Sequence, residues 1–157
     1  MSNVSSASHK RVSPALILSA LCCFVGLGLA VAVGIALPFI LKGYMERVTP
    51  ALLPHYLPLL LWLYLAIAIA VTVMVLLLAL LNVVRTGRIF TPVSGKLVFA
   101  ISVLVIIEGF VFGAVGGPFK LALCVAFVAV TMGLCLMVVS GVLREAAALK
   151  EENDGTI

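Results

Sequence analysis

The chain has 157 residues, of which 64% are hydrophobic and 10% are charged, and its formal net charge is +4. Soluble globular proteins are about half apolar and about a quarter charged, so this composition excludes a soluble domain. The sequence therefore predicts a protein whose main solvent is lipid.

Long stretches with no charged residue, or in the third case with only Glu108, define the predicted membrane spans. These stretches run from Arg11 to Lys42, from Arg47 to Arg85, from Lys96 to Lys120 and from Lys120 to Arg144. Each is long enough to cross a bilayer as a helix, which takes about 20 apolar residues. Continuous apolar runs favour helices over barrel strands, in which apolar and polar residues alternate. We expect an all-α membrane protein, a four-transmembrane-helix bundle with spans at about 14–41, 57–84, 93–116 and 119–143.

The first predicted span follows a 1–13 tail with a basic flank and could be mistaken for a signal peptide. From Pro14 to Leu41 it is uncharged, however, and much longer than the roughly 7–15-residue apolar core of a signal sequence. We expect it to remain as a helix. Ser13-Pro14, Thr49-Pro50 and Thr91-Pro92 each place a capping hydroxyl before a proline, which is typical of a helix start.

Lysine and arginine are distributed unequally over the two ends of the predicted spans. Because the number of spans is even, both termini and the 85–96 loop lie on one side. That side has Lys10, Arg11, Arg85, Arg88, Lys96, Arg144 and Lys150, and the other has Lys42, Arg47 and Lys120. The positive-inside rule predicts that both termini are cytoplasmic. The cations form no basic stripe with interleaved aromatic residues, so no direct binding of nucleic acid is expected.

Small residues recur at four-residue intervals within the predicted spans. The sets are Cys22, Gly26, Ala30 and Gly34 in the first span, Gly109, Gly113 and Gly117 in the third, and Ala129 and Gly133 in the fourth. Such ridges let helix backbones approach closely in lipid. Packing within the bundle is the preferred interpretation, and homo-oligomerisation through these faces is the alternative. The two histidines, His9 and His55, fall on opposite sides of the membrane, so no metal site or cofactor is expected.

Two cytoplasmic elements flank the last two spans. The loop after the second span carries Arg85 and Arg88, which can meet anionic lipid, and Phe90, which can enter the interface. The chain closes with a 144–157 tail of net charge −2, whose acidic residues include Glu151, Glu152 and Asp154. Its alanines and leucines favour a helix that continues past the membrane surface. The loop and the tail are candidate surfaces for a cytoplasmic partner, or an ordinary loop and a solvated helix end.

These two stretches, "TGRIFTPVSGK" and "LREAAALKEENDGTI", resemble the bacterial membrane-protein family of domain of unknown function 2975. Its Gly-x-x-Phe-Thr/Ser loop is matched by Gly87, Phe90 and Thr91. Its acidic tail is matched by Glu151, Glu152, Asp154, Thr156 and Ile157. The resemblance implies a four-span protein of the bacterial inner membrane with no established activity. It also implies a candidate partner class, because members are often encoded beside small helix-turn-helix regulators.

One acid, Glu108, interrupts the third span in "LVIIEGFVFG". It is equally far in sequence from Lys96 and Lys120, so it lies near the middle of the membrane. A central acid costs about 2.5–3.5 kcal/mol to insert, which predicts that it faces the bundle interior. Thr131, Thr72 and Tyr64 are the expected hydrogen-bond partners at workable depth. We favour a structural role that fixes helix register, with a proton or cation site as the alternative.

No catalytic constellation is recognisable, so we expect no enzyme. The preferred hypothesis is a non-catalytic regulatory or scaffolding module that engages a cytoplasmic partner. The alternative is a small proton-coupled transporter, or a transporter subunit, that uses Glu108.

Overall fold

The structure is a computed structural model, and it describes residues 14–86, 91–117 and 119–155. These residues form helices α1 (Pro14–Val48), α2 (Tyr56–Arg85), α3 (Pro92–Val115) and α4 (Lys120–Gly155), with a short 3₁₀ helix η1 (Pro50–His55) between α1 and α2. All four long helices are long and apolar enough to cross a membrane. The predicted all-helical, four-span fold is therefore confirmed.

Proline and glycine set the helix boundaries. The prolines at the starts of η1 and α3 lie at the first helical position, where their missing N–H is not needed. The extended backbone of Thr91 caps α3, but neither Thr49 nor Thr91 makes a side-chain capping hydrogen bond. The expected capping hydroxyls are thus wrong in that detail, while the proline starts are right. Ser13 lies outside the described residues.

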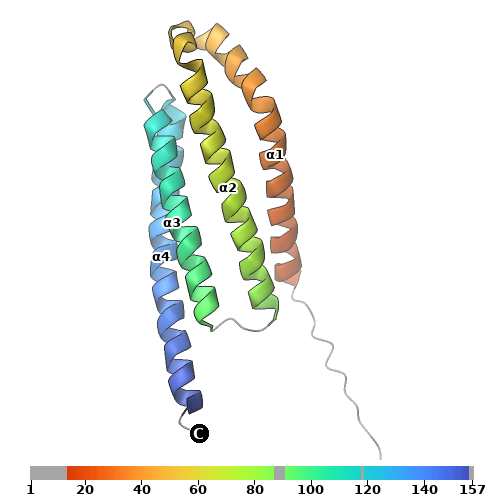
Figure 1. Cartoon of the computed structure of the whole chain (residues 1–157), viewed down its shortest axis with the longest axis vertical. Helices are drawn as coiled ribbons and strands as arrows, with labels where there is room; N and C mark the ends of the chain where they lie inside the picture. Colours follow the sequence, from red (N-terminus) through yellow and green to blue (C-terminus); the bar gives the residue numbers. More distant parts are fainter. Residues whose placement is uncertain (1–13, 87–90, 118, 156–157) are drawn as a thin grey trace, which may run out of the picture.

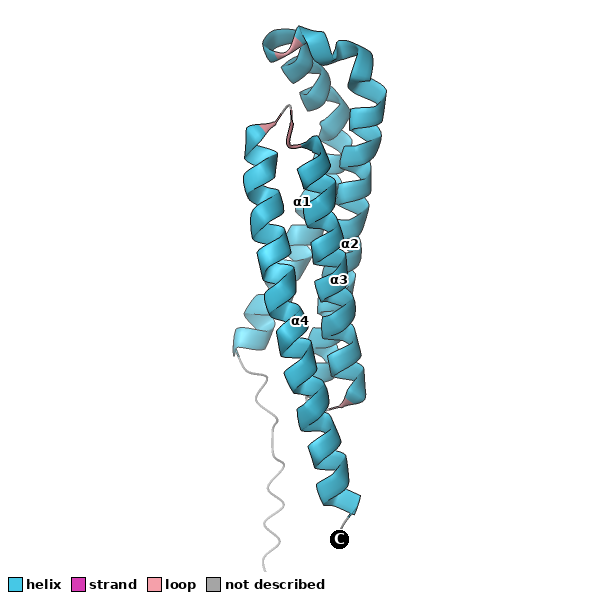
Figure 2. Ribbon diagram, turned by 90° about the vertical axis from the view of Figure 1, so that its left-hand side faces the viewer, coloured by secondary structure: helices cyan, strands magenta, loops and turns pink. Residues whose placement is uncertain are grey.

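The four helices stand in an open row (Figures 1 and 2). Close backbone approaches in the described part of the chain join α1 to α2, α2 to α3 and α3 to α4, and none joins α1 to α3 or α4, or α2 to α4. The start of α1, the end of α2, the start of α3 and the end of α4 lie at one end of the molecule. This matches the even-numbered topology that the sequence predicts.

The interface between α3 and α4 is a close antiparallel contact of small residues. On α3 they recur every seven residues at Gly95, Ser102 and Gly109, and the spacing continues at Gly116 just after its end. On α4 the buried small residues recur every seven residues at Ala126, Gly133, Ser140 and Ala147. A seven-residue repeat keeps one narrow face of each helix on its neighbour. A Cβ atom on Gly133 would lie 3.0 Å from the Ser102 carbonyl oxygen and 2.5 Å from Ile106 Cγ1.

Buried serines in this interface keep their hydrogen bonds within their own helix. The Ser102 hydroxyl donates to the Phe99 carbonyl over 2.7 Å, and the Ser140 hydroxyl donates to the Met137 carbonyl over 2.7 Å. Both serines are almost completely buried. A hydroxyl that is satisfied in this way can enter an apolar interface without an unpaired polar atom.

The four-residue ridges expected from the sequence contribute unequally to this interface. Gly109 and Gly133 pack between α3 and α4, whereas a Cβ on Gly113 would make only an ordinary contact of 3.8 Å and one on Gly117 would meet nothing. In α1, a Cβ on Gly26 would lie 3.1 Å from Met74 Cε of α2. Packing within the chain therefore uses these glycines selectively, and on α3 and α4 the repeat is seven residues.

Pro38 interrupts the hydrogen bonding of α1. Its ring nitrogen has no hydrogen to donate to the Gly34 carbonyl one turn earlier. The Tyr64 hydroxyl of α2 donates to that carbonyl over 3.0 Å, so the acceptor that the proline frees is satisfied by the neighbouring helix. The Tyr56 hydroxyl donates to the Pro38 carbonyl over 3.3 Å. The orange part of α1 leans toward α2 in this region (Figure 1).

Candidate functional site

Glu108 lies on the side of α3 that faces α1 and α2. The next residue, Gly109, packs against α4, and consecutive residues of a helix point about 100° apart. The half-buried Glu108 lines a cavity of about 230 Å³. Its other lining residues are all apolar: Val33 and Leu37 of α1, Leu63, Ala66, Ile67 and Ala70 of α2, and Phe112 of α3.

The structure does not gather the predicted partners around Glu108. The Thr131 hydroxyl donates to the Phe127 carbonyl over 2.9 Å, and the Thr72 hydroxyl donates to the Ala68 carbonyl over 2.8 Å; both side chains are exposed. Tyr64 uses its hydroxyl on Gly34. No residue in the described ranges gives Glu108 a hydrogen bond or an ion pair.

The register of α3 against α4 explains why Thr131 does not meet Glu108. The fourth helix does pack on the third, as the short turn between them predicts, but it packs on the Gly109 face. Glu108 precedes Gly109 by one residue and therefore points toward α2. Thr131 of α4 lies on the opposite side of α3 from the Glu108 side chain. Hydrogen bonds that fix helix register therefore do not account for Glu108.

A larger cavity of about 610 Å³ adjoins the Glu108 cavity toward the α3–α4 turn. The two share the lining residues Leu37, Leu63 and Phe112. Lys120 and Tyr44 line its far end, where the Tyr44 and Phe119 rings lie 5.4 Å apart between centroids. The two cavities together form a mostly apolar groove, hereafter the α1–α3 groove, which has α2 as its floor.

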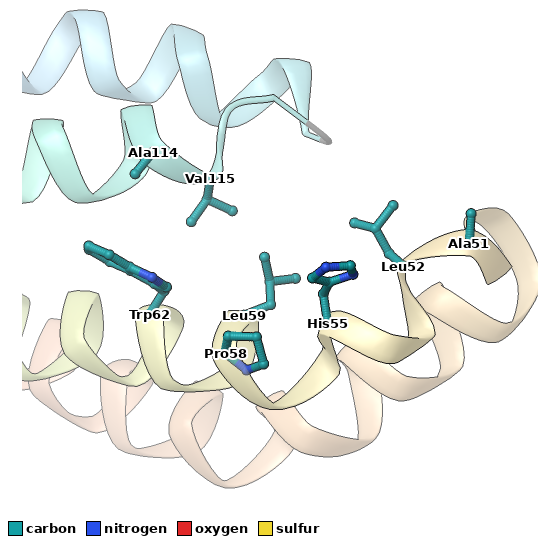
Figure 3. A pocket seen from close by; sticks show the side chains of 8 residues that line it. All are labelled: Ala51, Leu52, His55, Pro58, Leu59, Trp62, Ala114 and Val115. Atoms are coloured by element: carbon teal, nitrogen blue, oxygen red, sulfur yellow. The ribbon is translucent and has the colours of Figure 1, made fainter.

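A third cavity, of about 470 Å³, lies at the same end of the molecule. Figure 3 shows His55 and Trp62 at this cavity, with Ala114 and Val115 of α3 across from them. Val115 also lines the larger cavity of the groove, so it separates the two openings. Toward the α3–α4 turn, the α1–α2 pair and the α3–α4 pair are thus spaced apart on both sides of Val115.

A metal ion has no evident place in the described ranges. They hold no group of three or more His, Cys, Asp and Glu side chains that could bind one. His55 stands at the start of α2 among apolar residues and Trp62, as amphipathic rings do near lipid headgroups.

The candidate partner surface at the other end is described only in part. Arg85 is exposed in the last turn of α2. Arg88 and Phe90 lie outside the described residues. On α4, Glu151 and Glu152 are exposed, and only the backbone of Asp154 is described, in the last turns of the helix.

The tail continues α4 as an unbroken helix beyond the start of α3 (Figures 1 and 2). Arg144 lies against the start of α3: its guanidinium is 4.8 Å from the Phe99 ring centroid, and its side chain covers Gly95. Ala147 is still buried, whereas Leu149 is 67% exposed. The last turns of α4 therefore present both carboxylates and an apolar side chain.

Sequence reasoning missed the walls of the groove and the contact between Tyr64 and Gly34. The contact between Tyr64 and Gly34 had a signal in the sequence, since a proline inside a predicted span frees the carbonyl four residues earlier. The walls of the groove had no signal in the sequence, because Leu37, Leu63 and Phe112 look like any other apolar residues of a span.

Comparison with known proteins gives one match. A family model described as "Protein of unknown function (DUF2975)" matches residues 40–157. No curated protein and no solved structure matches the chain.

Proposed function

The chain belongs to the DUF2975 family of proteins of unknown function, and on that premise we propose that it is a membrane anchor that presents the end of α4 to a cytoplasmic partner. The observation that carries this proposal is the continuous helix of α4, which extends from the membrane-spanning part to Gly155. Residues 144–155 alone add about 18 Å at 1.5 Å per residue. A rigid helix of this length holds a docking surface at a fixed distance from the bilayer.

The exposed side chains define the chemistry of the partner. Glu145, Glu151 and Glu152 are exposed carboxylates, and an acidic segment is repelled by an anionic lipid surface, so it points into the cytosol. Leu149 offers an apolar contact among them. A basic protein surface with an apolar centre fits this end of α4. A helix-turn-helix regulator, the partner class that the family resemblance implies, is a candidate because its DNA-binding surface is basic. Arg85, Arg88 and Phe90 of the inner loop are additional candidate contacts.

The proposal requires that both termini lie in the cytoplasm of a bacterial inner membrane. A reporter that is active only in the cytoplasm should be active when fused after Ile157. Activity at that position of a reporter that works only after export would overturn both the orientation and the docking proposal.

The docking proposal is tested by affinity purification of the full chain from membranes, followed by binding of each recovered basic protein in purified form. A chain truncated after Ala148 keeps the buried Ala147 and loses Leu149 and the following carboxylates. It should insert normally and lose the partner, as should Leu149→Ser combined with Glu151→Lys. Glu46→Lys, which changes an exposed carboxylate on α1, is the matched control and should retain it. Partner binding that survives truncation would contradict the proposal.

A second candidate function rests on Glu108. A carboxyl group that has no partner among the described residues, in a cavity between three helices, fits a small transporter or a transporter subunit, because one carboxyl can hold either a proton or a cation at a time. Proton-coupled uptake into vesicles that contain the purified chain should be lost in Glu108→Gln. Uptake that the variant retains would exclude Glu108 as the coupling residue.

A further inference from the structure

We propose that the α1–α3 groove binds a lipophilic organic monocation, with its charge against the Glu108 carboxylate and its apolar substituents against Leu37, Leu63 and Phe112. The inference deepens the second candidate function by naming its ligand class. Binding itself, however, does not require that the chain transports the ligand.

The composition of the cavity wall selects an organic ion over an inorganic one. Among the described residues that line the groove, Glu108 supplies the only carboxylate, and the other described residues around the smaller cavity are apolar. Hard metal cations need about six oxygen ligands, which this wall does not provide. A cation that carries its own apolar substituents needs a single counter-charge and otherwise meets the surface it prefers.

The size of the groove fits a small organic molecule. Its two parts measure about 230 and about 610 Å³ and share three lining residues, and cavities for small ligands are typically about 300–1,000 Å³. Phe112, which lines both parts, offers an aromatic ring, and aromatic faces attract cations. The charge lies near the shared residues, within reach of Glu108, and the apolar substituents extend into both parts.

Lys120 decides between a cation and an anion. It is the other charged residue that lines the groove, and it stands at the far end beside Phe119. An anionic ligand, such as a lipid with a phosphate headgroup, would bind through Lys120 and leave Glu108 unused. A cationic ligand would gain from the removal of Lys120, since like charges then no longer oppose each other.

The test uses two probes of the same shape and opposite charge, tetraphenylphosphonium and tetraphenylborate. Equilibrium binding of each is measured on the full chain in discs of zwitterionic lipid. Tetraphenylphosphonium should bind saturably to the unaltered chain, and Glu108→Gln should weaken it by at least about tenfold, which corresponds to 1.4 kcal/mol. The control Glu46→Gln removes an exposed carboxylate of α1 that does not line the groove, and it should leave binding unchanged.

Further results support or overturn the proposal without relying on one variant. Lys120→Gln should leave phosphonium binding equal or tighter, while Lys42→Gln, outside the groove, should change nothing. Leu63→Trp should abolish binding by filling the shared wall. Saturable tetraphenylborate binding that Lys120→Gln removes would show an anion site and overturn the proposal, as would phosphonium binding that Glu108→Gln retains. Failed uptake with intact phosphonium binding would reject the transporter and keep the cation site.

Discussion

The two faces of α3 pack in opposite ways. The face toward α4 carries Gly95, Ser102, Gly109 and Gly116, and the backbones approach so closely that an added Cβ collides at Gly109. The face toward α2 carries Glu108, Phe112 and Val115, which line cavities. Thus α3 has one face that packs closely against α4 and another face that lines cavities.

The closely packed face of α3 stabilises the bundle, whereas the face that lines cavities is the candidate ligand site. In lipid, helix association depends on close van der Waals contact and on hydrogen bonds between helices, because apolar burial gains nothing against lipid tails. The α3–α4 interface meets this requirement through small residues. The α1–α2 pair relies more on hydrogen bonds from tyrosine, and the space between α2 and α3 remains available for a ligand.

The largest expected effect comes from filling the α3–α4 interface. Gly133→Ala should lower the free energy of unfolding by about 1–3 kcal/mol, because overpacking of a close contact forces side chains or backbones apart. Gly141→Ala on the same helix is the control, since its added Cβ meets nothing. The measurement is thermal or denaturant unfolding in detergent. Equal stability of the two variants would mean that the contact is not as close as described.

The next effect concerns the hydrogen bond between Tyr64 and Gly34. Tyr64→Phe should destabilise the protein by about 0.6–1.7 kcal/mol, the range of hydrogen bonds between membrane helices. Tyr44→Phe, whose ring pairs with Phe119, is the control. In a Pro38→Ala background the helix regains its own donor to Gly34, so Tyr64→Phe should then cost less. A double-mutant cycle without such coupling would contradict this account.

The contact between Arg144 and Phe99 should contribute less. Phe99→Leu keeps an apolar side chain and removes the aromatic face, so we expect a loss of about 0.5–1 kcal/mol in unfolding free energy. Arg144→Lys tests the same contact from the other side. If Phe99→Leu costs the same in an Arg144→Ala background, the effect comes from packing alone.

The smallest expected effect is that of Glu108 on stability. With no partner among the described residues, Glu108→Gln should change the unfolding free energy by less than about 0.5 kcal/mol, as most substitutions away from special contacts do. Glu108→Leu should not lower it either, because an acid at this depth is costly to insert. A large loss in both variants would return Glu108 to a structural role and weaken the case for a ligand.

The sequence by itself determined the class of the protein. Four long apolar stretches and their proline starts are local properties, and a bilayer requires such stretches to be helices. The alanines and leucines after Leu143 predicted that the fourth helix continues into the tail, and α4 extends to Gly155.

Only the tertiary structure decided what Glu108 faces. Neighbouring positions of an apolar helix look alike in sequence, and the choice between the Gly109 face and the Glu108 face depends on which side brings the helices closest. A four-residue glycine ridge and a seven-residue repeat of small residues coexist in α3, and the second one sets the register with α4. Because that register turns Glu108 away from Thr131, the acid lines a cavity between α1, α2 and α3.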